Sequence, residues 1–333
     1  MKAILWTAYG PPDVLELGEI ETPTPKDNEV LIRICATTVT VGDCQQRGLQ
    51  LPVWQALPMR AYVGFNRPER ITNLGMELAG EIESVGKDVA SFGKGDQVFA
   101  ATGLVGMGTY AEYICLPEEP EDGALAIKPA NMTYEEAAPV PVGGLEALHF
   151  LRRGNVRSGE KVLINGAGGT IGSYAVQLAK HFGAEVTGVD SADKLDMLRA
   201  IGADQVIDYK QEDFTERGEA YDFVLDVAGK GSLSNSVRVL KPNGRFFIAN
   251  PRPSQIVRGR WRSLVSGKKV MAGAADPKTK DLIYLKELVE AGELKTVIDR
   301  CYPLEQTAEA HRYVETGRKK GHVVITVAHA CRT

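Results

Sequence analysis

Short apolar runs alternate with turn residues over the first third of the chain. The clearest runs cover residues 30–34, 79–85 and 97–100, with Gly- and Pro-rich turns between them. The opening residues, Met1 to Trp6, also form a short apolar run and predict a first strand. This spacing is typical of a compact, mostly antiparallel barrel or sandwich, so we predict a mostly β domain over residues 1–128.

The pattern changes near residue 130, where strand-like runs begin to alternate with helix-length amphipathic segments such as 194–201 and 233–240. Alternation of this kind predicts a parallel, doubly wound sheet over residues 129–274, and therefore an α/β protein. The predicted strands of that sheet are 161–164, 185–189, 205–208, 222–226, 244–248 and 268–272.

The end of the chain predicts a return to the first domain. A helical pattern covers 281–291, an amphipathic segment covers 304–316, and Val323 to Val327 form a last apolar strand. We expect this strand to join the β domain, so that residues 275–333 complete it and the α/β domain is an insertion.

Length and charge narrow the class of protein. The chain has 333 residues, enough for two domains with separate cores, and a net charge of −4 that gives no reason to expect nucleic acid as a partner. No apolar run approaches the roughly 18 residues of a spanning helix, and the first residues are too short for a signal peptide. We therefore expect a cytoplasmic protein with no membrane partner.

Cysteine and histidine do not form a recognisable metal or disulfide pattern. The five cysteines include no C-x-x-C pair, which argues against a disulfide framework and a cysteine-rich zinc site, so we expect buried free thiols. The five histidines are scattered. His181 and His311 fall on predicted helices, where we expect them to be partly exposed.

The most informative stretch is 161–172, an apolar strand that enters a glycine-dense turn and continues as a helix. In a dinucleotide-binding turn, Gly166 would allow the tight bend, Gly169 would let the backbone approach a pyrophosphate, and Gly172 would let the helix pack closely. The free N–H groups of the helix start, at Thr170 and Ile171, would then point at the phosphates. The alternative is a glycine-rich turn of some other α/β protein.

An acidic residue follows at a suitable distance. Strand 185–189 ends at Asp190, which lies 21 residues after Gly169, and an acid near that position can hydrogen-bond the adenosine ribose hydroxyls. Strand, turn, helix, strand and acid in this order favour a bound nicotinamide dinucleotide.

These motifs, with several others, resemble those of the medium-chain dehydrogenase/reductase superfamily, in the zinc-free quinone oxidoreductase or enone reductase branch. The resemblance covers nearly the whole chain. It implies a GroES-like catalytic domain, a Rossmann domain, an active-site cleft between them and a homodimer joined through the Rossmann sheets. The further motifs are at 75–80, 108–113, 128–129, 132–138, 202–204 and 323–325.

The chain departs from the zinc-bearing members of that family at two ligand positions. Thr40, three residues before Asp43, stands at the position of their cysteine, and Met76 replaces their histidine. The third ligand region, 141–143, offers no Cys, His or carboxylate. A catalytic zinc needs about three protein ligands, so we predict no metal.

Without a Lewis acid, simple alcohols are poor candidates as substrates. Quinones and α,β-unsaturated carbonyls place the incoming negative charge on an oxygen that a few hydrogen-bond donors can stabilise. We predict a zinc-independent, NAD(P)H-dependent reductase of such small molecules. The alternatives are an alcohol dehydrogenase that works without zinc, and a redox sensor or structural protein that binds the nucleotide with little turnover.

Two residues are candidates for the chemistry. The resemblance places the Thr40 hydroxyl near the nicotinamide, although a threonine at a strand end can equally well bond the backbone. Tyr62 lies in the stretch between Gly48 and Gly75 that walls the substrate pocket in relatives, where it could donate to a carbonyl oxygen. Core packing is the alternative for Tyr62, as for Trp54 and Phe65, while Asp43 is expected to be structural.

The coenzyme preference is balanced between opposing residues. Asp190 would repel a 2′-phosphate, which favours NADH. Lys194 and Tyr209 stand where NADPH-using relatives contact that phosphate, and Ser191 is a further donor. We lean to NADH, with dual use possible.

Three further features complete the prediction. Val227, Ala228 and Asn250 follow two strands at their carboxyl ends and should flank the nicotinamide half of the coenzyme. Segment 252–269 is rich in Arg and Lys and is either a solvated loop or a phosphate-binding cap. Glu146 stands where relatives often have Thr, and the sequence does not explain it.

Overall fold

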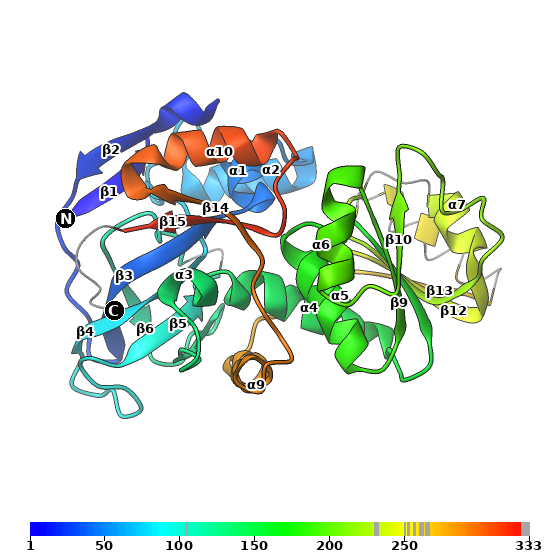
Figure 1. The fold of residues 1–333 in the computed structure, drawn as a ribbon. Helices are drawn as coiled ribbons and strands as arrows, with labels where there is room; N and C mark the ends of the chain where they lie inside the picture. Colours follow the sequence, from blue (N-terminus) through cyan, green and yellow to red (C-terminus); the bar gives the residue numbers. More distant parts are fainter. Residues whose placement is uncertain are drawn as a thin grey trace. The chain divides into compact units, whose positions relative to one another are not determined.

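The computed structural model describes most of the chain, and the described residues divide into two compact units. The first unit comprises 1–142, 277–292 and 296–333, and the second comprises 143–276 and 293–295. Figure 1 shows the elements of each unit. The residues not described are 104–105, 230–232, 250, 252–253, 256–257, 260–262, 264–266 and 328–333, with the side chain of Trp54.

The first unit is built mainly of strands. They are β1 (Lys2–Trp6), β2 (Leu15–Glu19), β3 (Glu29–Val39), β4 (Glu77–Val85), β5 (Gln97–Ala101), β6 (Tyr113–Pro117), β7 (Ala124–Ile127), β14 (Ile298–Pro303) and β15 (His322–Thr326). Its helices are η1 (Pro12–Val14), α1 (Val41–Arg47), α2 (Val53–Val63), α3 (Tyr134–Ala137), α9 (Thr279–Glu290), η3 (Leu304–Gln306) and α10 (Thr307–Glu315), and α4 begins within this unit.

Strand β3 is the centre of the seven-stranded sheet in this unit. The sheet order is β14-β15-β3-β4-β5-β7, with β6 also paired to β3, and only β14 and β15 run parallel. Strand β15 pairs antiparallel with β3, with Val324 opposite Thr38. Strand β15, which the sequence predicted to rejoin the β domain, thus pairs with the central strand of this sheet.

The core of this unit explains why these strands form. Ile32 on β3, Leu78 on β4, Val98 on β5 and Ile325 on β15 are almost fully buried and belong to one apolar cluster. All four side chains are apolar, and removing such side chains from water is the main favourable contribution to folding. Burial of this cluster joins segments from both ends of the chain.

The second unit alternates strands and helices. Its strands are β8 (Lys161–Asn165), β9 (Glu185–Asp190), β10 (Gln205–Asp208), β11 (Tyr221–Asp226), β12 (Leu240–Ile248) and β13 (Lys269–Ala272). Its helices are α4 (Val140–Gly154, from Gly143 onward), α5 (Thr170–His181), η2 (Ala192–Lys194), α6 (Leu195–Ala200) and α7 (Leu233–Arg238).

All six strands of the second unit are parallel, in the order β10-β9-β8-β11-β12-β13. This order winds outward in both directions from β8 and β11, as in the Rossmann fold, so the predicted α/β class is confirmed. Helix α4 packs on this sheet through Phe150, whose ring centroid lies 4.7 Å from that of Phe247. A Cβ at Gly154 would come within 2.5 Å of Phe223, so only glycine allows this approach.

The cysteines differ from the prediction of buried free thiols. Cys35 is disulfide-bonded, which a search for closely spaced pairs in the sequence could not detect, because bonding depends on proximity in the fold. Cys44, Cys115 and Cys301 are free, but only Cys44 is buried and Cys301 is exposed. Cys331 lies outside the described residues.

The prediction that His311 is partly exposed is wrong. His311 on α10 is fully buried, and its Nδ1 lies 3.1 Å from Arg47 and 3.4 Å from the Cys44 thiol. Arg47 on α1 is 1% exposed, donates from Nε to the Gly10 carbonyl at 3.0 Å, and pairs with Glu315. This buried polar cluster joins α1 to α10.

Burial makes His311 a source of acid sensitivity. Desolvation, assisted by the Arg47 charge, lowers the pKa of His311 to about 3. The unfolded chain therefore binds a proton below about pH 6.5 that the folded protein refuses, so stability falls as the pH falls. Between about pH 7.5 and about pH 5, we expect His311 to remove about 2 kcal/mol from the free energy of unfolding.

Denaturant titrations of wild type and His311→Asn in one buffer series would measure this loss. The variant is expected to be less stable near neutral pH, yet to lose about 2 kcal/mol less over that range. Parallel stability curves for the two proteins would contradict the assignment.

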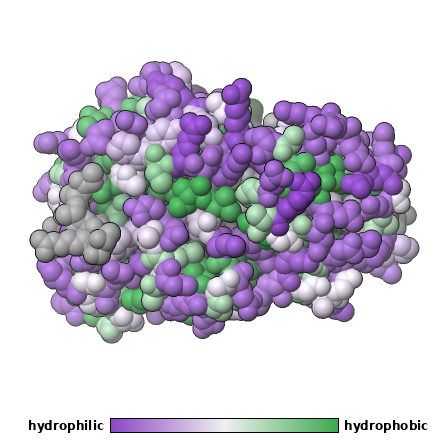
Figure 2. All heavy atoms as spheres, in the orientation of Figure 1, coloured by the Kyte–Doolittle hydropathy of each residue, from purple (hydrophilic) through white to green (hydrophobic). Residues whose placement is uncertain are grey.

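On the face drawn in Figure 2, hydrophilic side chains cover most of the surface and apolar side chains form separate patches. Among the described residues, no helix is long and apolar enough to cross a membrane.

Candidate functional site

The glycine turn of the second unit joins β8 to α5. Gly166 has φ of +88°, a conformation that favours glycine, and a Cβ there would lie 3.1 Å from the Ala228 nitrogen. At Gly172 a Cβ would lie 2.2 Å from the Gly166 carbonyl and 2.6 Å from the Cα of Ala167. The turn and the first turn of the helix therefore touch through bare backbone.

Gly169 differs from these two glycines. Its backbone is extended, with φ of −95°, and the nearest atom to an added Cβ is the Gly166 carbonyl at 3.6 Å. Space for a side chain therefore exists at Gly169, where the sequence predicts that the protein backbone approaches a diphosphate.

Helix α5 begins immediately after Gly169, and no side chain caps its N-terminus. The first N–H groups of an α-helix have no partner within the helix, and together with the helix dipole they favour an anion. Thr170 and Ile171 lie at this end, as predicted. The open space at Gly169 and the uncapped helix start fit the diphosphate of a dinucleotide.

Asp190, at the end of β9, lies beside the turn. Its Oδ2 accepts from the Gly168 N–H at 2.8 Å, and its Oδ1 accepts from the Ser191 N–H at 2.8 Å. Lys194 Nζ lies 3.2 Å from the same Oδ1, and both side chains are less than 10% exposed. In the sequence, Asp190 favours NADH and Lys194 favours NADPH. Their spacing of four residues could have indicated that the two side chains form an ion pair.

Ser191 and Tyr209 lie nearby but in different settings. The Ser191 hydroxyl donates to Asp193 at 2.6 Å. The Tyr209 N–H donates to the Asp190 carbonyl at 3.2 Å, while the side chain is 56% exposed. Tyr209 is therefore fixed to the end of β9 by its backbone, while its ring is exposed and has Lys210 Nζ 6.0 Å from its centre.

The loop after β11 completes this edge of the sheet. Val227 and Ala228 donate their N–H groups to the Asn165 carbonyl at 3.0 and 3.2 Å. The Asp226 carboxylate accepts from the Asn165 amide at 3.0 Å and from the Gly229 N–H at 2.9 Å, and burial raises the pKa of Asp226. The pairing of Asn165 with Asp226 was not predicted from the sequence. Both residues stand at the carboxyl ends of predicted strands, and this position could have indicated the pair.

Two predicted features fall wholly or mostly outside the described residues. Asn250 is not described, nor is most of the basic segment 252–269.

In the first unit, Thr40 is the N-cap of α1. Its hydroxyl donates to Asp43 Oδ2 at 2.6 Å and accepts from the Asp43 N–H at 3.2 Å, while the Thr40 N–H donates to the same carboxylate at 2.8 Å. This reciprocal capping box gives Asp43 the structural role that the sequence predicted. Burial raises the pKa of Asp43.

Met76, the other position that the resemblance assigns to a zinc ligand, and its neighbour Glu77 are also bonded within the protein. The Met76 sulfur accepts from the Gln46 amide at 3.6 Å. Glu77 is 1% exposed and accepts from the Thr38 hydroxyl and, at 2.7 Å, from the Val142 N–H. Among the described residues, no group of three His, Cys, Asp or Glu side chains is arranged to hold a metal ion.

Tyr62 lies near the end of α2 and is 42% exposed. The guanidinium of Arg70 lies 5.8 Å from the centre of its ring. Phe65, just after the helix, is 63% exposed. Core packing, the alternative for these two side chains, is therefore wrong in this structure, whereas the Trp54 side chain is not described.

Glu146 lies on α4 in the second unit and is partly exposed. Burial raises its pKa to about 7. Nothing in the structure explains why this position carries a carboxylate.

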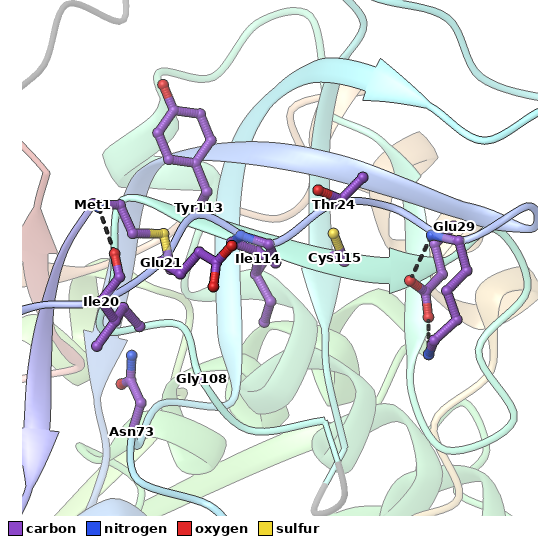
Figure 3. Close-up of a pocket in the computed structure, with 12 residues that line it drawn as sticks. Met1, Ile20, Glu21, Thr24, Glu29, Asn73, Gly108, Tyr113, Ile114 and Cys115 are labelled. Atoms are coloured by element: carbon purple, nitrogen blue, oxygen red, sulfur yellow. Dashed lines mark hydrogen bonds and ion pairs between the residues drawn. The ribbon is translucent and has the colours of Figure 1, made fainter.

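A separate pocket of about 450 Å³ lies within the first unit, and no predicted site residue lines it. Figure 3 shows Ile20, Glu21 and Thr24 together with Tyr113, Ile114 and Cys115 of β6 among the residues that line it. Burial, reinforced by the charge of Glu29, raises the pKa of the Cys115 thiol to about 11, so it stays protonated at neutral pH. A protonated thiol is a weak nucleophile, and this pocket has no evident chemistry.

Comparison with known proteins identifies two matching family models. The model for the alcohol dehydrogenase GroES-like domain matches residues 26–123, and the model for the zinc-binding dehydrogenase domain matches residues 201–325. The second model is named for zinc binding, whereas Thr40 and Met76, at the two positions that the family resemblance assigns to zinc ligands, lie in the stretch matched by the first model.

Individual relatives match almost the whole chain. The 2-methylene-furan-3-one reductase of Solanum lycopersicum is 32% identical over 98% of this chain and 79% of its own length. The chloroplastic NADPH-dependent alkenal/one oxidoreductase of Arabidopsis thaliana is 30% identical over the same shares. The solved structure of the quinone oxidoreductase from Coxiella burnetii superposes with a TM-score of 0.85, at 31% identity, over 98% of this chain and 99% of that one.

Proposed function

The chain belongs to the medium-chain dehydrogenase/reductase superfamily, in its quinone oxidoreductase branch, and from this premise we propose that it reduces quinones or the C=C bond of α,β-unsaturated carbonyls with NAD(P)H. Three relatives that match 98% of this chain are named for these two reactions. A bound nicotinamide supplies a hydride to the electrophilic carbon of such acceptors.

The observation that carries this proposal is the glycine turn. The uncapped start of α5 and the room above Gly169 suit a diphosphate, and Gly166 and Gly172 hold the turn against the helix. The adjacent carboxyl ends of β9, β8 and β11 provide the crevice in which ligands of this fold bind.

The residues of the first unit would stabilise the negative charge that develops on the acceptor oxygen. The Thr40 hydrogen is directed to Asp43, so an ionised Asp43 leaves Thr40 able only to accept. In the part of the chain that the structure describes, no hydrogen bond engages the Tyr62 hydroxyl, so Tyr62 is the available donor. We assign Tyr62 to charge stabilisation, and assign Thr40 to donation only when Asp43 is protonated.

For coenzyme choice, we propose that both NADH and NADPH are used. The charge of Asp190, which favoured NADH, lies within 3.2 Å of the Lys194 ammonium. A carboxylate whose charge is offset by a nearby ammonium repels a 2′-phosphate weakly. The exposed side chain of Tyr209 lies at the same strand end. One full-length relative is named as NADPH-dependent.

Assembly and location stay predictions. The edge strand β13 of the six-stranded sheet is where two copies would join into the homodimer that the family resemblance implies. We predict a cytoplasmic protein, whereas one relative is named as chloroplastic.

Steady-state oxidation of NADH and NADPH with a panel of quinones, enones and enals tests the proposal. We expect turnover with at least one acceptor, unchanged by a metal chelator. Tyr62→Phe is expected to lower kcat by about 10-fold to 100-fold with that acceptor, because one donor to the developing oxyanion is lost, while coenzyme affinity stays the same.

The alternatives give different results in the same assay. Chelator-sensitive oxidation of simple alcohols would favour a metal-dependent alcohol dehydrogenase, and chelator-resistant oxidation would favour one without zinc. Tight coenzyme binding without turnover of any acceptor would favour the sensor or structural role. Each of these results would overturn the proposed reaction.

A further inference from the structure

One hydrogen bond links the end of β9 to the glycine turn. Asp190 Oδ2 accepts the Gly168 N–H at 2.8 Å, and the carboxylate is held from its other side by the Ser191 N–H at 2.8 Å. Asp190 is only 8% exposed. Each of its two oxygens therefore already accepts a backbone N–H of the protein.

Lys194 covers the same turn. Its side chain is 8% exposed, its Nζ lies 3.2 Å from Asp190 Oδ1, and its Cδ would lie 2.6 Å from a Cβ built on Gly168. The aliphatic stem of Lys194 thus packs over Gly168 while its charge offsets that of Asp190. Gly168 is needed here to make room for Lys194.

We propose that Asp190 is a positioning residue that holds the glycine turn in its binding conformation, and so sets the affinity for NADH and NADPH alike instead of selecting between them. This inference rests on the proposed use of a nicotinamide coenzyme.

The physical basis is the cost of leaving buried groups without partners. A hydrogen bond from a backbone N–H to a carboxylate is stronger than one between neutral groups. Removing Asp190 leaves the Gly168 N–H without its acceptor and takes away the carboxylate that lies 3.2 Å from the buried Lys194 ammonium. The turn then relaxes, and the N–H groups that face the diphosphate lose their arrangement.

A selector role makes the opposite prediction for one coenzyme. If Asp190 accepts from the ribose hydroxyls of NADH and repels the 2′-phosphate of NADPH, Asp190→Ala should tighten NADPH binding and weaken NADH binding. If Asp190 holds the turn, the variant should bind both coenzymes about 10-fold or more weakly, with the ratio of the two dissociation constants changed by less than about 3-fold.

The experiment measures dissociation constants for NADH, NADPH and ADP by calorimetry, for wild type, Asp190→Ala, Asp190→Asn and Asp196→Ala. ADP carries the diphosphate without a 2′-phosphate or a nicotinamide. Asp190→Asn keeps one oxygen to accept the Gly168 N–H and is expected to restore part of the lost affinity. Asp196→Ala removes the same charge from a fully exposed side chain six residues away and is expected to bind like wild type.

Hydrogen exchange gives a readout that does not depend on the coenzyme. The Gly168 amide is expected to exchange faster in Asp190→Ala than in wild type, while thermal unfolding identifies any global loss of structure. In steady-state assays the KM for the coenzyme should rise while kcat stays the same.

Tighter NADPH binding by Asp190→Ala, or unchanged binding of all three ligands with unchanged Gly168 exchange, would overturn the inference. If wild type binds none of the three ligands, the proposed function itself fails, and the two failures are thereby distinguished.

Discussion

Gly169→Ala is expected to fold as stably as wild type and to bind NADH and NADPH about 100-fold more weakly, because a methyl group would displace the diphosphate from two or more charge-assisted N–H bonds. The free protein has room for this methyl group, since the nearest atom lies 3.6 Å away and the backbone is extended. Calorimetric binding and thermal unfolding together check the result.

Two other glycines serve as controls for this variant. In Gly172→Ala the new Cβ meets backbone atoms at 2.2 and 2.6 Å, so we expect both lower stability, by about 2 kcal/mol, and loss of binding. In Gly93→Ala, in a turn of the first unit, the nearest atom is 4.0 Å away, and both properties should match wild type. If a folded Gly169→Ala variant kept the coenzyme affinity of wild type, the diphosphate would not bind at this turn.

Arg47→Met is expected to lower the free energy of unfolding by about 3 kcal/mol, because it breaks a buried ion pair by removing one partner. The variant leaves the Gly10 carbonyl and the His311 ring nitrogen without their donor, in a site that is 1% exposed at Arg47. Glu315 keeps about one-third of its side-chain surface exposed and can hydrate, which limits the loss. Urea denaturation of wild type and variant measures the difference.

Arg312 offers a matched control on the neighbouring helix face. Its side chain is 43% exposed and pairs with Asp13 and Glu309, both more exposed still. Exposed ion pairs contribute about 1 kcal/mol or less, so Arg312→Met should change stability little. Equal effects of the two substitutions would show that burial of the Arg47 cluster does not stabilise the junction of α1 and α10.

The fold was predictable from the sequence because its signals are local. Apolar periodicity placed the six strands of the second unit within a few residues, and the glycine turn of 166–172 lies within one strand–turn–helix. Each of these features depends on residues that are neighbours in the chain.

The errors arose where distant segments meet. The burial of His311 depends on the packing of α10 against α1, from opposite ends of the chain, and helical spacing alone cannot give this. The pairing of Asp190 with Gly168 depends on the rotamer of one side chain, which the position at a strand end leaves open. The prediction that the Thr40 hydroxyl lies near the nicotinamide depends on a rotamer in the same way, and in this structure that hydroxyl donates to Asp43.

The pairing of β3 with β15 also determines when the first sheet can be completed during synthesis of the chain. The sheet of the second unit is complete once β13 has been made, whereas one edge of β3 waits for a strand near the far end of the chain. An unpaired apolar strand is prone to associate with other chains. Until β15 has been synthesised, this edge of β3 in the nascent chain is exposed and can associate with other chains. Synthesis that halts before His322 leaves the edge exposed.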